Sequence, residues 1–105
     1  WKRLRMNRAC NMLGLCVRAG RLVSGQQAVE TALKAGKAKL VLVDEGASDG
    51  TKKALGDACR YRGVELIQMG EQALGNAIGR PGRMAAAVTD APFAERIRQL
   101  LTQAD

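Results

Sequence analysis

The sequence has no histidine, two prolines and only three aromatic residues, Trp1, Tyr61 and Phe93. Without histidine the chain lacks the commonest general base and the commonest metal ligand of proteins. A nucleophilic cysteine would also lack its usual basic partner, so we expect neither an enzyme nor a metal-binding protein. The aromatic rings are too few for the stacking platform on which many proteins hold single-stranded nucleic acid.

Acidic residues are absent from the first 29 positions. The other 76 residues hold eleven basic and ten acidic side chains, so the net charge of +7 comes almost entirely from the first 29. A local excess of this kind favours a polyanion as partner, and nucleic acid first. A membrane is not expected, because no long stretch pairs a basic face with a strongly apolar one. The basic residues of this first part are Lys2, Arg3, Arg5, Arg8, Arg18 and Arg21.

Long apolar runs and paired cysteines are also missing. No window approaches the length of a membrane span, and Asn11 and Gly14 interrupt the apolar run after the basic start, which argues against a secretory signal. The three cysteines form no C-x-x-C pair, and we expect them to be reduced and mostly buried in a cytoplasmic protein. They are Cys10, Cys16 and Cys59. Because the chain begins with Trp1 and not Met, we also expect residues to precede it.

What the sequence does contain is a regular alternation of helical and strand patterns, over a length that suits a single domain, residues 1–105. This alternation predicts a helix–sheet–helix sandwich around a mainly buried sheet. The pattern predicts strands over 40–43, 64–69 and 84–89 and an extended segment over 21–24. It predicts a first helix over 7–19 and a second between Ser24 and Gly36. Three more helices follow: one capped by Ser48 or Asp49 and ended by Gly63, a short one ended by Gly79, and a last one capped by Asp90.

The helix that follows Ser24 is the segment where we expect a ligand. Ser24 and Gln27 have the spacing of a capping box, in which each side chain bonds a backbone amide of the other. The spacing favours this structural role, but Gln27 could instead present its amide to the edge of a base. In either case a helix N-terminus at a polar surface is a ready site for phosphate.

Two loops are candidate binding sites. The loop G-A-S-D-G at 46–50 follows a strand and precedes a helix, but it matches neither nucleotide-binding glycine pattern, and Asp44, Glu45 and Asp49 would repel phosphate. We interpret it as an ordinary turn and expect no cofactor and no small-molecule substrate. The turn at 79–83 carries Arg80 and Arg83, which either clamp a nucleic-acid backbone or are solvated surface charge.

Segments 25–43 (G-Q-Q-A-V-E-T-A-L-K-A-G-K-A-K-L-V-L-V), 74–83 (L-G-N-A-I-G-R-P-G-R) and 85–90 (A-A-A-V-T-D) resemble the ribosomal protein L-seven-Ae/L-thirty-e superfamily of kink-turn RNA binders. The opening segment 11–25 strengthens the resemblance, which extends from about Leu13 to Leu101 and is most similar to the bacterial YlxQ-type branch. The resemblance implies an α/β/α sandwich with a four-stranded mixed sheet. It implies RNA contacts at Gly25–Thr31, Glu45–Ala47 and Arg80–Met84.

The chain departs from the family pattern at positions that determine specificity for kink-turn RNA. The kink-turn readers of the family have an Asn-Glu pair and a downstream lysine where this chain has Gln27, Ala28 and Thr31. The strand-end loop also departs at Asp44 and Gly46. The RNA-binding residues that the resemblance implies are Gly25, Gln26, Gln27, Thr31, Lys34, Lys37, Glu45, Arg80, Arg83 and Met84, with Arg8, Arg18 and Arg21 as outlying phosphate contacts.

The sequence thus predicts a small, non-catalytic, cytoplasmic and monomeric protein that binds structured RNA, either kink-turn-like or ribosomal, in association with translation. One alternative is a protein–protein interaction module of the same fold that has lost kink-turn specificity. A second is the substrate-recognition domain of an RNA-modifying enzyme, against which the short length argues.

Overall fold

The computed structural model describes residues 2–102, with side chains from Met6 onward. The helices are α1 (Lys2–Arg18), α2 (Gln26–Lys34), α3 (Asp49–Arg62), α4 (Ala73–Ile78) and α5 (Ala91–Thr102). The strands are β1 (Leu22–Ser24), β2 (Leu40–Asp44), β3 (Leu66–Met69) and β4 (Ala85–Val88). The side chains of Lys2, Arg3 and Arg5, which belong to the basic first part of the chain, lie outside the described residues.

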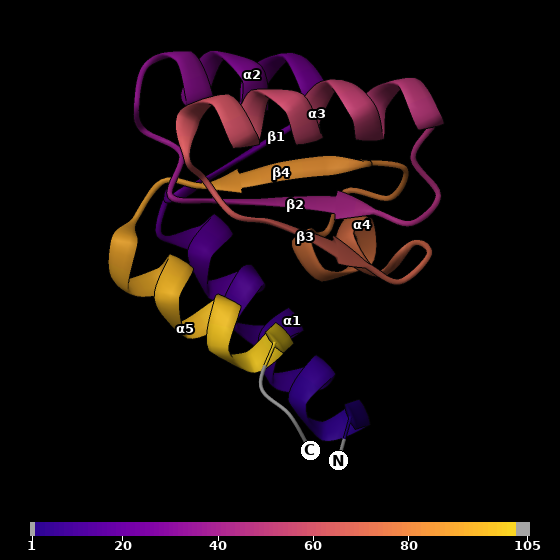
Figure 1. Cartoon of the computed structure of the whole chain (residues 1–105). Coiled ribbons are helices and arrows are strands. Elements are labelled where there is room, and N and C mark those ends of the chain that lie inside the picture. The colour runs from indigo at the N-terminus through magenta and orange to yellow at the C-terminus, as the bar shows by residue number, and fades with distance from the viewer. Residues whose placement is uncertain (1, 103–105) are drawn as a thin grey trace.

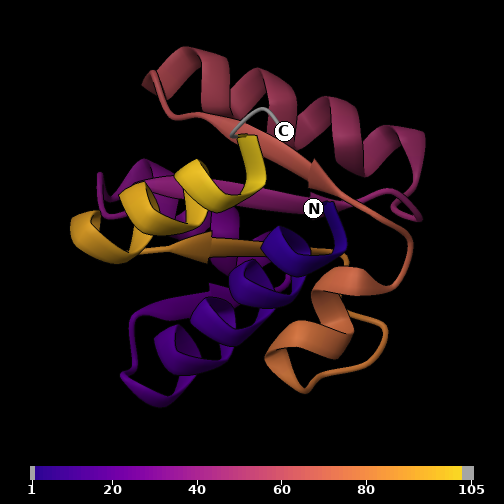
Figure 2. The same cartoon turned by 90° about the horizontal axis from the view of Figure 1, so that it is seen from below.

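The strands form one mixed sheet in the order β1-β4-β2-β3. β2 runs parallel to β3, and β4 is antiparallel to both β1 and β2. The helices α2 and α3 cover one face of the sheet, and α1, α4 and α5 cover the other (Figure 1); Figure 2 views the second of these faces directly. The predicted α/β/α sandwich with a four-stranded mixed sheet is confirmed.

The central strands are buried on both faces. Leu40 and Leu42 of β2 pack into the core beneath α1, α4 and α5, whereas Val41 and Val43 pack beneath α2 and α3. Each fully buried aliphatic side chain of this size stabilises the fold by about 1.5–3 kcal/mol. The continuous apolar run of β2 therefore joins the two halves of the core, as expected for a strand covered on both faces.

Most of the predicted helix ends are present. The backbone N–H of Thr51 donates to the Ser48 hydroxyl at 3.1 Å, so Ser48 caps α3, and the N–H of Phe93 donates to the Asp90 carboxylate at 3.0 Å. Gly63 ends α3 in the left-handed conformation that a residue with a Cβ rarely adopts. The predicted bounds of three elements were wrong: α1 begins at Lys2 and ends at Arg18, while β3 and β4 are shorter than 64–69 and 84–89.

The capping box at the start of α2 was also wrong. Ser24 lies in β1, opposite Ala86 of β4, and no side chain caps the helix. The capping position belongs to Gly25, and Gln27 is an exposed residue within the first turn. Strand pairing takes Ser24 into the sheet, so its hydroxyl is not placed over the helix amides.

The three cysteines are free thiols, with Cys16 and Cys59 buried and Cys10 half-buried. Burial raises the pKa of the Cys10 and Cys59 thiols. Burial, together with the nearby Asp90 carboxylate, raises the pKa of Cys16 to about 11. These thiols are thus poorly suited to nucleophilic chemistry.

Two further features bear on the kind of protein. None of the helices in residues 2–102 is both long and apolar enough to cross a lipid bilayer. Within the same part of the chain, no three or more cysteine, aspartate or glutamate side chains are grouped so that they could hold a metal ion.

Candidate nucleic-acid interface

Gly25 starts α2 and leaves the first amides of the helix without protein partners. Its φ is 98°, a value that favours glycine, and this lets the chain turn directly from β1 into the helix. Its N–H donates to the carbonyl of Ala85 at 2.9 Å, and its carbonyl accepts from the N–H of Val29 at 3.0 Å. Among the described residues, the N–H groups of residues 26–28 have no hydrogen-bond acceptor. Such amides at the positive end of a helix dipole are suited to an anion.

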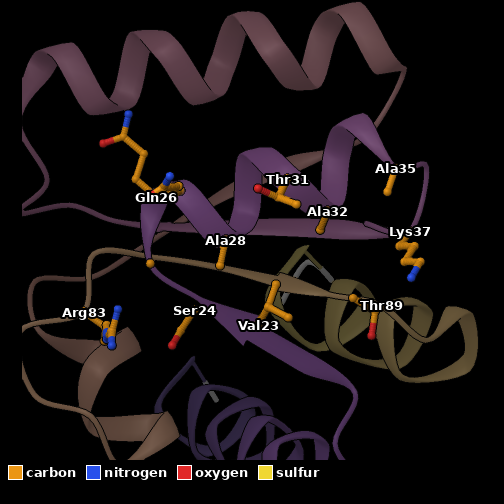
Figure 3. Close-up of a pocket in the computed structure, with 12 residues that line it drawn as sticks. Val23, Ser24, Gln26, Ala28, Thr31, Ala32, Ala35, Lys37, Arg83 and Thr89 are labelled. Carbon is orange, nitrogen blue, oxygen red and sulfur yellow. The ribbon is translucent and has the colours of Figure 1, made fainter.

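Arg83 lies against this helix start. Its Nη1 atom is 2.6 Å from the position that a Cβ would occupy on Gly25, and Figure 3 shows its side chain beside the beginning of α2. A cation next to the positive end of a helix is unfavourable by about 0.3–1 kcal/mol. An anion placed between the two would be attracted by both, so the pair is arranged to receive one.

The turn that carries Arg83 is held against α4. Gly75 of α4 has no side chain to separate them: a Cβ there would lie 2.9 Å from the Arg80 carbonyl oxygen and 3.2 Å from the Gly82 nitrogen. The N–H of Arg80 also donates to the Gly75 carbonyl at 2.9 Å, and the N–H of Arg83 donates to the Arg80 carbonyl at 3.2 Å. This close packing fixes the backbone positions of Arg80 and Arg83, from which their side chains extend.

A hollow of about 790 Å³ lies between α2 and β1, and we call it the α2-side hollow. Arg83 stands at the end next to the start of α2, and Lys37 and Thr89 stand at the other end (Figure 3). The exposed side of the helix contributes Gln27 and Thr31. Among the described residues that line it, none is acidic, so the hollow is open to a negatively charged ligand.

A second hollow of about 420 Å³, the α1-side hollow, lies on the opposite side of β1. Val17, Leu22 and Ile78 give it an apolar wall, and Arg80 adds a positive charge. The two hollows share four lining residues, so they are continuous around the edge of the sheet. The shared residues are Val23, Ser24, Ala28 and Arg83.

The predicted site residues are thus partly brought together. Gly25, Gln27, Thr31, Lys37 and Arg83 line the α2-side hollow, and Arg80 lines the α1-side hollow.

Gln26 also borders the α2-side hollow, but its side chain points away from it towards α3 (Figure 3). Its Nε2 donates to the Glu30 carboxylate at 3.2 Å, and its Oε1 accepts from the Thr51 hydroxyl at 3.1 Å. Gln26 therefore links the first turns of two helices.

Three predicted residues lie elsewhere. Lys34 lines a separate hollow between α2 and α3, together with Asp57 and Tyr61. Met84 is half-buried and packs against the core beneath α2 and α3. Glu45 is exposed at the end of β2, where its N–H donates to the Met69 carbonyl at 2.8 Å. Side chains close in the sequence are separated here because helix and strand faces point in different directions.

The three outlying arginines do not border either hollow. Arg8 is exposed on α1, and Arg21 is exposed between α1 and β1. The Arg18 guanidinium lies back along α1, with Nη1 3.7 Å from the position of a Cβ on Gly14. Arg18 and Arg21 add positive charge close to the start of β1, whereas Arg8 lies further back on α1.

Sequence reasoning missed the contribution of two residues. Ala28 is half-buried and lines both hollows. Asp44, expected only to repel phosphate, is fully buried: one carboxylate oxygen accepts from the Gly46 N–H at 2.7 Å, and the other has no hydrogen-bond partner among the described residues. No local signal marks either position, because both depend on how distant segments pack.

Residues 8–97 match the ribosomal protein L7Ae/L30e/S12e/Gadd45 family. Two relatives have the name RNA-binding protein YlxQ. The chain is 41% identical to the Bacillus subtilis (strain 168) protein over 91 residues, which cover 86% of this chain and 91% of the relative. It is 33% identical to the Enterococcus faecium protein over 95 residues, which cover 90% of this chain and 91% of the relative.

Solved structures give the same fold. A protein with unknown function from Bacillus halodurans C is similar with a TM-score of 0.87 and 33% identity, over 90% of this chain and 97% of that one. The 15.5 kD RNA-binding protein of Giardia lamblia is similar with a TM-score of 0.75 and 20% identity, over 91% of this chain and 84% of that one. At 20% identity, the second likeness concerns the fold alone.

Proposed function

The chain belongs to the ribosomal protein L7Ae/L30e/S12e/Gadd45 family, and we propose that it is a non-catalytic RNA-binding protein that holds structured RNA against the start of α2. Two relatives of nearly the same length have RNA-binding protein as their name. The observation that carries the proposal is the position of Arg83 over the first turn of α2, beside a hollow with no acidic lining residue among those described.

In this proposal a backbone phosphate lies between Arg83 and the N–H groups of residues 26–28. The guanidinium can donate two parallel hydrogen bonds to phosphate oxygens, which fixes the orientation of the strand. Lys37 at the far end of the α2-side hollow and Arg80 at the sheet edge contact flanking phosphates. These contacts position the RNA and carry no sequence information.

Recognition of the RNA's shape falls to the exposed side of α2. Because Gln27 is not part of a cap, its amide is available to donate and accept at a base edge. Thr31, one turn further along the same side, is also exposed. We propose kink-turn-like or ribosomal RNA as the target of a monomeric, cytoplasmic protein that acts in translation.

The test is fluorescence anisotropy with a labelled kink-turn RNA and a plain duplex of equal length, at about 50 mM and about 200 mM salt, since affinity carried by phosphate contacts falls steeply with salt. Arg83→Gln should weaken binding of both RNAs about tenfold or more and reduce the salt slope by about one. The matched control is Arg62→Gln, an exposed arginine at the end of α3 that lies beside the hollow between α2 and α3.

Each outcome has a definite meaning. A kink-turn RNA that binds much more tightly than the duplex supports specific recognition through Gln27. Equal binding of both RNAs, lost as salt rises, supports RNA binding and contradicts kink-turn specificity. Absence of binding to either RNA at low salt overturns the proposed function, as does an equal loss in the Arg83 and Arg62 variants.

A further inference from the structure

The open edge of β1 is a binding surface that the proposed RNA contacts do not use fully. Within residues 2–102, β1 is the end strand of the sheet and pairs only with β4. Its three residues are half-buried, whereas all four residues of β4 are buried. Edge strands with unpaired backbone groups are templates for pairing with another extended chain.

The hydrogen-bond pattern identifies which groups point outward. Thr89 donates to the carbonyl of Arg21, and Gly25 donates to the carbonyl of Ala85, each at 2.9 Å. In an antiparallel pair the bonded positions alternate, so Val23 also bonds towards β4. The N–H and carbonyl groups of Leu22 and Ser24 therefore face away from the sheet.

The two hollows lie on opposite sides of this edge. An added strand would place alternate side chains on its two faces, and hence one set in the α1-side hollow and the other in the α2-side hollow. The wall formed by Val17, Leu22 and Ile78 suits aliphatic side chains, and Arg80 and Arg83 border the same hollow. The α2-side hollow, with Lys37 and Arg83 and no acidic residue among its described lining, suits carboxylates.

We propose that β1 binds an extended peptide segment of a partner protein, with aliphatic and acidic residues in alternation, as an added strand beside Leu22 and Ser24. Main-chain hydrogen bonds give affinity in this mode and the side-chain pockets give specificity. A second copy of this chain is disfavoured as the occupant, because it would bring its own arginines against Arg80 and Arg83. This proposal does not depend on RNA binding, but both ligands would use Arg83 and should compete.

The first probe is a fluorescein-labelled peptide of four Val-Glu repeats, with four Val-Lys repeats as the charge control. We expect the acidic peptide to bind at least about tenfold more tightly, since opposite charges face it across the groove. In a hydrogen-exchange experiment followed by NMR, its binding should slow exchange of the Leu22 and Ser24 amides about tenfold or more, while that of Val23 changes less.

Two further comparisons isolate strand addition from charge attraction. Backbone N-methylation at all valines or at all glutamates removes alternate donors, so one series should lose binding and the other should retain it. Val17→Glu places a carboxylate in the α1-side hollow and should weaken the acidic peptide about tenfold, whereas Leu15→Glu, on the same helix but outside both hollows, should not.

Several results would overturn the proposal. The proposal would be wrong if the acidic peptide did not bind, or if the two methylated series had equal effects. It would also be wrong if the peptide bound without slowing exchange of the Leu22 and Ser24 amides, or if light scattering showed a dimer that forms through β1. Failure of both RNAs to bind would leave the peptide result unaffected, so this proposal and the proposed function fail separately.

Discussion

The Nη1 atom of Arg83 lies 2.6 Å from the point where a side chain on Gly25 would begin, so the guanidinium rests on the first turn of α2 only because that residue is glycine. Gly25→Ala should displace Arg83 and strain a backbone with a φ of 98°. We expect the free energy of unfolding to fall by about 1–2 kcal/mol. We also expect RNA affinity to fall, though less than in Arg83→Gln, because the shifted guanidinium keeps its charge.

The matched control is Gly36→Ala, at a glycine with a φ of 72° and open space around its Cβ position. It should cost similar stability and leave RNA affinity unchanged. Equal RNA affinity in the Gly25 variant and the wild type, measured by anisotropy on folded protein, would show that the position of Arg83 on α2 is unimportant.

A substitution at Gly75 should also affect RNA binding, through the turn that carries Arg80 and Arg83. A Cβ at Gly75 would meet backbone atoms of Arg80 and Gly82 at 2.9 and 3.2 Å, and backbone cannot rotate away as a side chain can. Gly75→Ala should therefore push the turn off α4, lower the free energy of unfolding by about 1–3 kcal/mol and weaken RNA binding. Gly56→Ala on α3, where a Cβ would meet only the end of Arg60, is the control for both measurements. Unchanged crystal positions of Arg80 and Arg83 in the Gly75 variant would contradict this account.

The fold could be predicted from the sequence because its signals are local and repeated. Each signal determines the structure of the residues next to it. Examples are the apolar run that forms β2, the glycines that end helices, and the polar caps at Ser48 and Asp90. The capping box failed for the opposite reason. Whether Ser24 caps a helix or pairs with Ala86 is decided by a strand far along the chain.

The site could be predicted only in part for the same physical reason. The resemblance and the spacing placed Gln27, Thr31 and Arg83 on one surface, and the structure does bring them to one hollow. Lys34 is in the same helix as Gln27 but lies beside α3, because its position in the helical turn points it to another face. The contact between Arg83 and Gly25 depends on tertiary packing that no local pattern encodes.

Asp44 should lower stability through its charge. Its carboxylate is fully buried, and one oxygen has no hydrogen-bond partner among the described residues. Asp44→Asn keeps an acceptor for the Gly46 N–H and removes the charge, so we expect the free energy of unfolding at neutral pH to rise by about 1 kcal/mol. Asp44→Ala leaves that N–H unsatisfied and should be about 1–3 kcal/mol less stable than the Asn variant. Urea unfolding measures both; an Asn variant less stable than wild type would contradict a net cost of the buried charge.

Cys16 should make stability fall at alkaline pH. Burial and the Asp90 carboxylate raise its pKa to about 11 in the folded protein, whereas an unfolded thiol has a pKa of about 8.5. Below about pH 8.5 both states keep the proton and the thiol has no effect on the pH dependence; as pH rises from there towards 11, the unfolded state loses the proton first and stability falls. Urea unfolding between pH 8 and 10 should show a decline that is smaller by about 1–2 kcal/mol in Cys16→Ala. Parallel declines in the two proteins would contradict the shifted pKa.

Kink-turn selectivity should be gained by restoring the three readers that the resemblance implies. Gln27 and Thr31 are exposed and Ala28 is half-buried beside Arg83, so Gln27→Asn, Ala28→Glu and Thr31→Lys together can be accommodated on the outer side of α2. A carboxylate that accepts from a base edge contributes about 1.5–3 kcal/mol. The ratio of kink-turn to duplex affinity should therefore rise at least about tenfold.

The double variant Gln27→Asn with Thr31→Lys is the control for that experiment. It adds a positive charge without the carboxylate, so it should strengthen binding of both RNAs and leave their ratio nearly unchanged. If the triple variant also leaves the ratio unchanged, the carboxylate introduced by Ala28→Glu pairs with Arg83 instead of the RNA. If the ratio then rises when Arg83→Gln is added to the triple variant, the glutamate had been paired with Arg83, because the added substitution removes that partner.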